Sequence, residues 1–227
     1  MKRFVRIALA DLAFAWGGLG VLSATTDLTS GLVAWYPFDG NASDMSGNGY
    51  HGTVDGATLG ADRHGMASSS YDFDGANDRI KIGDAALNEA NAFTISMWVK
   101  LDAGKNYHCL LSGAKSSTDN NEFLVESSSG VFVLRLKSAS VTGSALSTTS
   151  WSDTWRQLVF SRASTTATVN VSLDGALAQS YTAIAGSSTI ANNGLWLGAD
   201  QDTVGGGWDS TQHFQGSIDE VRIYDRA

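Results

Sequence analysis

The sequence predicts an all-β protein made of two stacked antiparallel sheets, and three observations support this fold class. The 227 residues include 25 glycines, a single proline and few long helix-forming runs, which favours strands joined by many tight turns. Short segments of strand composition recur between turn clusters from Gly31 onward. In the longest of these segments, apolar and polar residues alternate as they do in a half-buried strand.

Twelve segments have strand composition. They cover residues 32–36, 71–73, 79–82, 93–101, 109–113, 122–126, 131–137, 157–162, 167–173, 179–182, 194–197 and 217–224. Alternation is clearest in 94–100 and 131–137, so each of these strands should place one face in the core. Asp174-Gly175 predicts a hairpin turn, since glycine accepts a positive φ without steric cost. Residues 85–90 favour one helical turn, and no linker divides the chain after residue 31.

The N-terminus is typical of a secretory signal peptide. Lys2, Arg3 and Arg6 precede an apolar run over 12–22, and small residues follow at 23–25. About eleven apolar residues are too few to span a bilayer. We therefore predict a signal peptide over 1–24, one mature domain over 25–227, no membrane span, and a secreted or cell-surface protein. A buried N-terminal strand is the alternative, because Asp11 lies at the edge of the run.

Charge and cysteine content exclude several classes of protein. The formal net charge is −8, and removing residues 1–24 makes it about −10, which argues against nucleic acid as a partner. Cys109 is the only cysteine, so neither an intrachain disulfide nor a multi-cysteine metal site can form. We predict that Cys109 is a buried small hydrophobe.

The last predicted strand contains two adjacent carboxylates, Asp219 and Glu220, between the strand formers Ile218 and Val221. A buried or half-buried acid needs a partner, so we expect a cationic group beside this strand.

A set of motifs, taken in order, strongly resembles the laminin-G-like, concanavalin A-like lectin and glucanase domains. The resemblance covers about residues 31–227 and implies a two-sheet antiparallel jelly-roll sandwich. The motifs are GLVAWYPFDG at 31–40, DMSGNGYHG at 44–52, FDGAND at 73–78, FTISMWVK at 93–100, WRQLV at 155–159, LDG at 173–175 and GSIDEVRIY at 216–224.

A structural calcium ion is the predicted cofactor. Four oxygen-bearing side chains lie within ten residues of a glycine-rich loop, and calcium prefers such hard oxygen ligands. They are Asp39, Asn41, Asp44 and Asn48. Asp219 would supply a distant carboxylate if the last strand pairs near the first, and the resemblance implies this arrangement. The alternative is that these groups only satisfy turn backbones. A second acidic loop contains Asp72, Asp74, Asn77 and Asp78, and its sequence is equally typical of a tight turn.

Catalysis is the minority hypothesis. Related glucan-cleaving enzymes carry interleaved carboxylates on one strand, and no Glu-x-Asp-x-Glu occurs here. Glu122 and Glu126 share a strand face, yet about 13 Å would separate their Cα atoms, so polar edge positions are the expected role. The sequence contains neither a nucleophile elbow nor a phosphate-binding loop. The four histidines lack zinc-ligand spacing.

Aromatic residues give the candidate ligand contacts, because sugars stack on exposed rings. Trp151 and Trp208 fall in predicted loops, and Tyr107 and His108 fall in another loop, so we predict that these four residues form a glycan-contacting rim. Four other tryptophans fall in or beside predicted strands, where core packing is the default. They are Trp35, Trp98, Trp155 and Trp196.

The leading hypothesis is a secreted, non-catalytic module that recognises a carbohydrate or an extracellular glycoprotein and is stabilised by calcium. The alternatives are a glycan-cleaving hydrolase or lyase on the same fold, and a structural adhesion module of a larger surface protein. Turnover of a polysaccharide panel would favour the enzyme, and failure to bind any sugar would favour the adhesion module.

Overall fold

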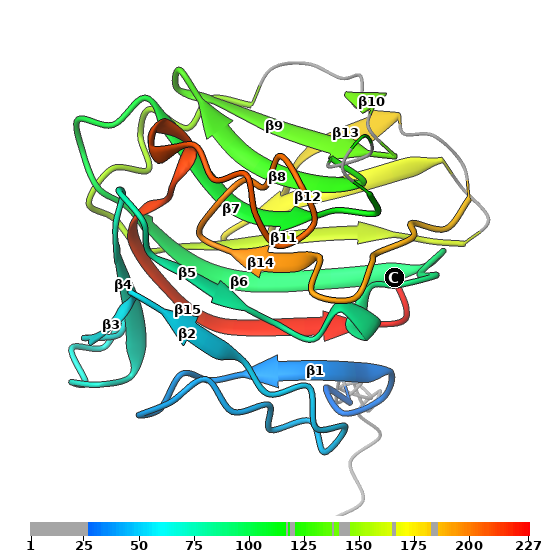
Figure 1. Ribbon diagram of the computed structural model, residues 1–227, viewed down its shortest axis with the longest axis horizontal. Coiled ribbons are helices and arrows are strands. Elements are labelled where there is room, and N and C mark those ends of the chain that lie inside the picture. Colours follow the sequence, from blue (N-terminus) through cyan, green and yellow to red (C-terminus); the bar gives the residue numbers. More distant parts are fainter. Residues whose placement is uncertain are drawn as a thin grey trace, which may run out of the picture.

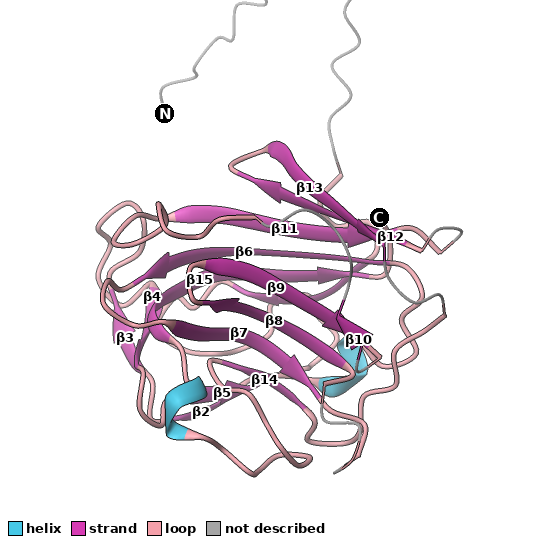
Figure 2. Ribbon diagram, turned by 90° about the horizontal axis from the view of Figure 1, so that it is seen from above, coloured by secondary structure: helices cyan, strands magenta, loops and turns pink. Residues whose placement is uncertain are grey.

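The computed structural model describes residues 27–227 except 117, 119, 120, 138, 141–145, 165, 166 and 183–185, so the predicted signal peptide lies outside the described residues. Two antiparallel sheets stack face to face and enclose the core (Figures 1 and 2). This arrangement confirms the predicted two-sheet β-sandwich.

The first sheet has eight strands, in the order β13-β12-β11-β6-β15-β4-β3, and β1 pairs with the same β15. The bounds are β1 (Leu32–Tyr36), β3 (Thr58–Gly60), β4 (Ser70–Asp74), β6 (Phe93–Leu101), β11 (Arg156–Arg162), β12 (Thr168–Leu173), β13 (Ala176–Thr182) and β15 (Gln215–Tyr224).

The second sheet has seven strands, in the order β10-β9-β8-β7-β14-β5-β2. The bounds are β2 (Thr53–Asp55), β5 (Arg79–Lys81), β7 (Tyr107–Gly113), β8 (Phe123–Ser128), β9 (Val131–Leu136), β10 (Ala139–Ser140) and β14 (Leu195–Leu197).

All twelve predicted strands are present, and the three that were not predicted are the short strands β2, β3 and β10. The predicted hairpin joins β12 to β13, with positive φ at both Asp174 and Gly175. Two short 3-10 helices complete the described elements, η1 (Asp84–Ala86) and η2 (Ser210–Gln212). Among the described residues, no helix has the length and apolar character needed to cross a membrane.

The core lies between the sheets and is filled by the inward residues of each strand. In β6, Phe93, Ile95, Met97 and Val99 are almost completely buried, and the residues between them face outward. Phe123 of the second sheet packs edge-on against Phe93, with ring centroids 5.4 Å apart. The alternation of apolar and polar residues in the sequence therefore predicted correctly which face of this strand lies in the core.

A β-bulge in β15 explains the two carboxylates of the last strand. Glu220 has a φ of +53°, and the register with β6 shifts between Asp219 and Arg222. The extra residue lets both Ile218 and Val221 enter the core although three positions separate them. Asp219 and Glu220 therefore interrupt the apolar pattern without occupying core positions.

The prediction that four strand-associated tryptophans pack in the core is wrong. Each is only half-buried, and each has a cation over its ring: Arg222 at Trp35, Arg63 at Trp98, Lys100 at Trp155 and Arg79 at Trp196. The distances from cation to ring centroid are between 4.8 and 5.9 Å. The rings lie on the outer faces of the sheets, where the side chains of Lys and Arg cover part of their apolar surface.

Candidate functional site

Asp44, the central residue of the predicted calcium loop, is buried and fully used by hydrogen bonds. Its Oδ1 accepts from the backbone N–H groups of Trp35 and Ser46 at 2.9 and 2.8 Å. Its Oδ2 accepts from the Ser46 hydroxyl and the Tyr50 N–H at 2.9 and 3.0 Å. Burial by itself raises the pKa of Asp44, but these hydrogen bonds outweigh it and hold the pKa below its ordinary value.

The other predicted ligands of this loop also satisfy the backbone. Asn41 Oδ1 accepts from the Ser43 N–H at 2.8 Å, and Asn48 Nδ2 donates to the Val33 carbonyl at 2.9 Å. Asp39 is exposed. These hydrogen bonds agree with the alternative interpretation, in which the acids and amides of this loop satisfy the backbone of turns.

The predicted adjacency of the first and last strands is confirmed, because Tyr36 of β1 pairs with Val221 of β15. Asp219 nevertheless has a different partner from the one predicted. Its Oδ2 lies 2.7 Å from Nη1 of Arg63, in an ion pair whose carboxylate side chain is 2% exposed. The expected cationic group is therefore an arginine. Burial raises the pKa of Asp219 to about 7, although the Arg63 guanidinium opposes this shift.

The residues proposed for calcium do not fit a shared metal site in this arrangement. No group of three or more His, Cys, Asp or Glu side chains suited to a metal occurs in the described part of the chain. In the second acidic loop, Asp74 Oδ1 accepts from the Ala76 N–H, and Asp78 Oδ2 accepts from the Asp74 N–H. That loop is stabilised as a tight turn.

Thermal unfolding tests the calcium prediction, and the hydrogen bonds and ion pair described above lead us to expect that the metal has no effect. We expect EDTA to leave the Tm unchanged and Asp219→Ala to lower the Tm equally in calcium and in EDTA, because the carboxylate pairs with Arg63. The loss should be about 1–3 kcal/mol, the usual cost of a hydrogen bond to a charged group. A rise in Tm with calcium that Asp219→Ala or Asp44→Ala abolishes would contradict this expectation and establish the site.

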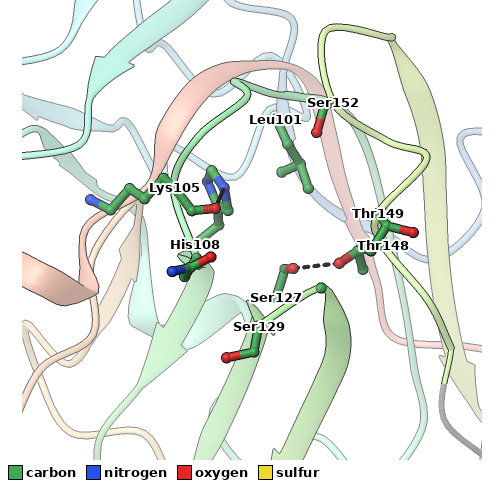
Figure 3. A pocket seen from close by; sticks show the side chains of 10 residues that line it. Leu101, Lys105, His108, Ser127, Ser129, Thr148, Thr149 and Ser152 are labelled. Atoms are coloured by element: carbon green, nitrogen blue, oxygen red, sulfur yellow. Dashed lines mark hydrogen bonds between the residues drawn. The ribbon is translucent and has the colours of Figure 1, made fainter.

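Two of the four predicted ligand contacts lie at one end of the sandwich, next to a small hydroxyl-lined pocket of about 260 Å³ (Figure 3). Ser127 and Thr148 point toward one another in this pocket, with 2.6 Å between their hydroxyl oxygens. His108 is buried there, with Nε2 3.2 Å from the Lys105 carbonyl oxygen. Burial lowers its pKa, so His108 is neutral at pH 7. Tyr107 precedes it, and the predicted loop position of both residues is wrong, because they begin β7.

Trp151 was predicted to contact a ligand, and this prediction is wrong. Its side chain is 1% exposed and packs in the core, 6.3 Å from the Phe132 ring. The backbone of the loop bends at this point, where Trp151 N–H donates to the Thr148 carbonyl. Although Trp151 lies in a loop, its ring is directed into the core, and no face of the ring is exposed for stacking on a ligand.

The fourth predicted contact, Trp208, packs against Trp196, which lines a second and larger pocket on the outer face of the seven-stranded sheet. We call this pocket the tryptophan groove and define it by its lining residues Trp196, Lys81, Asn193 and Asp55, with Trp208 beside Trp196. The space along it is about 480 Å³, and its lining residues come from β2, β5 and β14 and from the loop at Val204 and Gly205. The ring centroids of Trp196 and Trp208 are 5.1 Å apart, at 70°.

Strand register places the groove residues side by side. Trp196 of β14 lies opposite Lys81 of β5, and Lys81 lies opposite Thr53 of β2. Trp196 Nε1 donates to the Asn193 carbonyl at 2.7 Å, which orients the indole ring. Arg79 forms an ion pair with Asp55, and its guanidinium lies 4.8 Å from the Trp208 ring centroid. The aromatic surface is therefore held by contacts on several strands.

The loop that carries Trp208 is anchored from below by Gln201, which is completely buried. Gln201 Nε2 donates to the Gly194 carbonyl at 2.8 Å, and its Oε1 accepts from the Gly205 N–H at 2.9 Å. Gly205 has a φ of +65°, and a side chain there would begin 3.2 Å from the Asn193 carbonyl. These contacts preorganise the groove wall before any ligand arrives.

Sequence reasoning missed Trp196, Arg79, Lys81 and Asn193 as site residues. A signal was present, because Leu195 and Leu197 face the core and strict alternation then directs Trp196 outward. The same alternation places Ile80 inward and both neighbouring cations outward. Asn193 lies in a turn and gave no signal.

The expected edge role of Glu122 and Glu126 is also wrong. β8 lies between β7 and β9, and both side chains are buried. Glu122 Oε1 accepts from the Thr189 N–H, whereas Glu126 Oε2 is buried without a hydrogen-bond partner. Burial raises the pKa of Glu126 to about 7. Cys109, its cross-strand neighbour, is buried as predicted, and burial raises the pKa of its thiol.

Comparison with protein families identifies the fold. A family model, Laminin_G_3, described as the Concanavalin A-like lectin/glucanases superfamily, matches residues 74–227. The chain belongs to this family, which confirms the resemblance inferred from its motifs. The Rattus norvegicus protein "Sushi, von Willebrand factor type A, EGF and pentraxin domain-containing protein 1" is 28% identical over 143 residues. The match spans 63% of this chain and 4% of that protein.

Two solved structures show the same fold. Domain 4 of a GH43 extracellular arabinanase from Geobacillus stearothermophilus, in complex with arabinotriose, has a TM-score of 0.57 and 23% identity, with 85% of this chain and 91% of that chain covered. The botulinum neurotoxin serotype G binding domain has a TM-score of 0.64 and 12% identity, with 86% of this chain and 48% of that chain covered.

Proposed function

We propose that this domain is an extracellular carbohydrate-recognition module and that the tryptophan groove is its binding site. The observation that carries the proposal is the pair of half-buried indole rings, Trp196 and Trp208, beside hydrogen-bonding groups of Lys81 and Asn193. Sugar rings have apolar faces that stack on aromatic surfaces and hydroxyls that need polar partners. The groove offers both within one strand-supported surface.

Related proteins support this proposal at the level of function class. The arabinanase domain was solved with arabinotriose, and a botulinum neurotoxin binding domain of the same fold was solved "in complex with SialylT". Laminin-G-like domains are typically extracellular, which agrees with the predicted signal peptide over 1–24 and with a secreted or cell-surface location.

The charge distribution of the groove favours binding over hydrolysis. Glycoside hydrolysis requires two carboxyl groups within about 5–10 Å of one another across the scissile bond. Among the described residues that line the groove, Asp55 is the single acid, and Arg79 pairs with it. Glu126 is buried and lines neither site described above.

Replacing Trp196 by alanine tests the proposal. A glycan array identifies sugars that the wild-type domain binds, and calorimetry then measures Kd for the wild type and for Trp196→Ala. We expect Kd to rise about tenfold or more, since removing a stacking ring costs about 1.4 kcal/mol or more. Trp155→Ala is the matched control, because Trp155 is also half-buried under a cation but lies on the other sheet.

Far-UV circular dichroism and the Tm confirm that both variants are folded. Equal affinity of the two variants for every bound sugar would place the site elsewhere. Release of reducing ends or unsaturated products during incubation would instead show that the domain is an enzyme.

A further inference from the structure

The tryptophan groove carries one cation that no acid neutralises. Lys81 Nζ donates to Asn193 Oδ1 at 3.1 Å, and no carboxylate of the described residues lies within ion-pair distance of it. The neighbouring cation, Arg79, is paired with Asp55. Asp84, behind the groove, accepts from the Asn193 backbone N–H at 3.4 Å. The groove therefore presents a positive charge although the whole chain has a net charge of −8.

Lys81 and Trp196 are direct cross-strand partners on the same outer face. The Cβ atoms of such partners are about 4.5–5.5 Å apart, which is close to the width of a pyranose ring. An ammonium group has three donors, and Asn193 takes one of them, so two donors are left for a ligand of the groove that Lys81 lines. A sugar stacked on Trp196 would thus hold a substituent of its ring beside Lys81 Nζ.

We propose that the groove selects sugars that carry a carboxylate, and that Lys81 is the residue that recognises this carboxylate. The inference rests on the proposed carbohydrate-binding function and names its ligand class as acidic glycans built from uronic acids. An N⁺–H···O⁻ hydrogen bond is roughly twice as strong as a neutral one, so an unpaired ammonium in the groove favours a uronate over the neutral sugar of the same shape. Asn193 holds the ammonium in position, and the indole ring supplies the stacking surface.

The test compares oligosaccharides of the galacturonate, glucuronate, mannuronate and guluronate series with their carboxyl-reduced neutral counterparts. Calorimetry is done at about physiological ionic strength, where charges more than about 8 Å apart are largely screened, so that the net charge of the protein contributes little to Kd. For at least one series we expect the wild-type domain to bind the acidic form about tenfold or more tightly than the neutral form. Lys81→Gln should abolish the preference, so that the Kd values of the acidic and neutral forms become equal within about twofold.

Lys100→Gln is the matched control, since it removes the same charge from β6 of the other sheet, where Lys100 lies over Trp155. It should keep the preference for the acidic form. Equal or tighter binding of the neutral form in every series, no binding in any series, or a preference that survives Lys81→Gln would overturn the inference. Loss of neutral-sugar binding in Trp196→Ala tests the proposed function separately, so the two failures are distinguishable.

Discussion

Replacing Arg162 by methionine is expected to lower the free energy of unfolding by about 3–5 kcal/mol, because three carbonyl groups lose a charged donor and each loss costs about 1–3 kcal/mol. Arg162 lies at the end of β11 and is 1% exposed. Its Nε donates to the Asn91 carbonyl at 2.9 Å, and its Nη2 donates to the Ala90 and Gly186 carbonyls at 3.2 and 2.8 Å. Methionine fills a similar volume but removes the guanidinium donor from all three carbonyls, and the Ala90 carbonyl then keeps only the Ser188 N–H at 3.4 Å.

The position of Arg162 explains the size of this effect. The guanidinium ties the segment before β6 to the segment after β13, and it lies 5.2 Å from the Phe93 ring centroid. Urea unfolding measures the change. Arg156→Met is the matched control on the same strand, because Arg156 pairs with Asp174 where both side chains are about one-third exposed. We expect the control to cost less than about 1 kcal/mol. Similar losses in the two variants would contradict the assigned role of Arg162.

Replacing Glu126 by glutamine is expected to stabilise the protein at pH 8 by about 2–3 kcal/mol and to have little of this effect at pH 4.5. Burial raises the pKa of Glu126 from 4.5 to about 7, with Arg135 at 3.9 Å opposing the shift and Asp200 adding to it. Between pH 4.5 and about pH 7, Glu126 binds more protons in the folded protein than in the unfolded chain. Ionisation therefore removes stability as the pH rises from about 4.5 to about 7, and glutamine avoids this loss.

The measurement is the difference in free energy of unfolding between wild type and Glu126→Gln at several pH values. A difference is needed because other groups titrate in the same pH range, and their contributions cancel between the two proteins. Burial lowers the pKa of His108 and His213, which removes stability as the pH falls below about 6.5, and burial raises the pKa of Asp200 to about 6. A difference that stays constant between pH 4.5 and 8 would contradict the assigned burial of an ionisable Glu126.

The fold could be predicted because its signals are local. Alternation in β6 and the Asp174-Gly175 turn each depend on neighbouring residues, and the ordered motifs then identified the family. The short strands β2 and β10 escaped because three or fewer residues cannot establish a period. Pairing of β1 with β15 was also predicted, since both ends of the domain carry family motifs.

The site was predicted less well, because side-chain partners depend on tertiary contacts. Asp219 and Arg63 are 156 positions apart, so no local pattern pairs them. The apolar character of tryptophan predicted burial in strands and exposure in loops. In the structure, the alternation of β14 places Trp196 on the outer face, and the loop directs Trp151 into the core. Trp208 was correctly located in a glycine-rich loop, but its contact with Trp196 required the fold.

The central place of β15 has a consequence for synthesis of the protein. This strand pairs with β1, β6 and β4, and it contributes Ile218, Val221 and Ile223 to the core. A nascent chain that still lacks residues 215–224 cannot join its first strand to the rest of the eight-stranded sheet. We therefore expect the domain to remain protease-sensitive until these residues have been made and have reached the compartment where the chain folds, and to close its core in one late step.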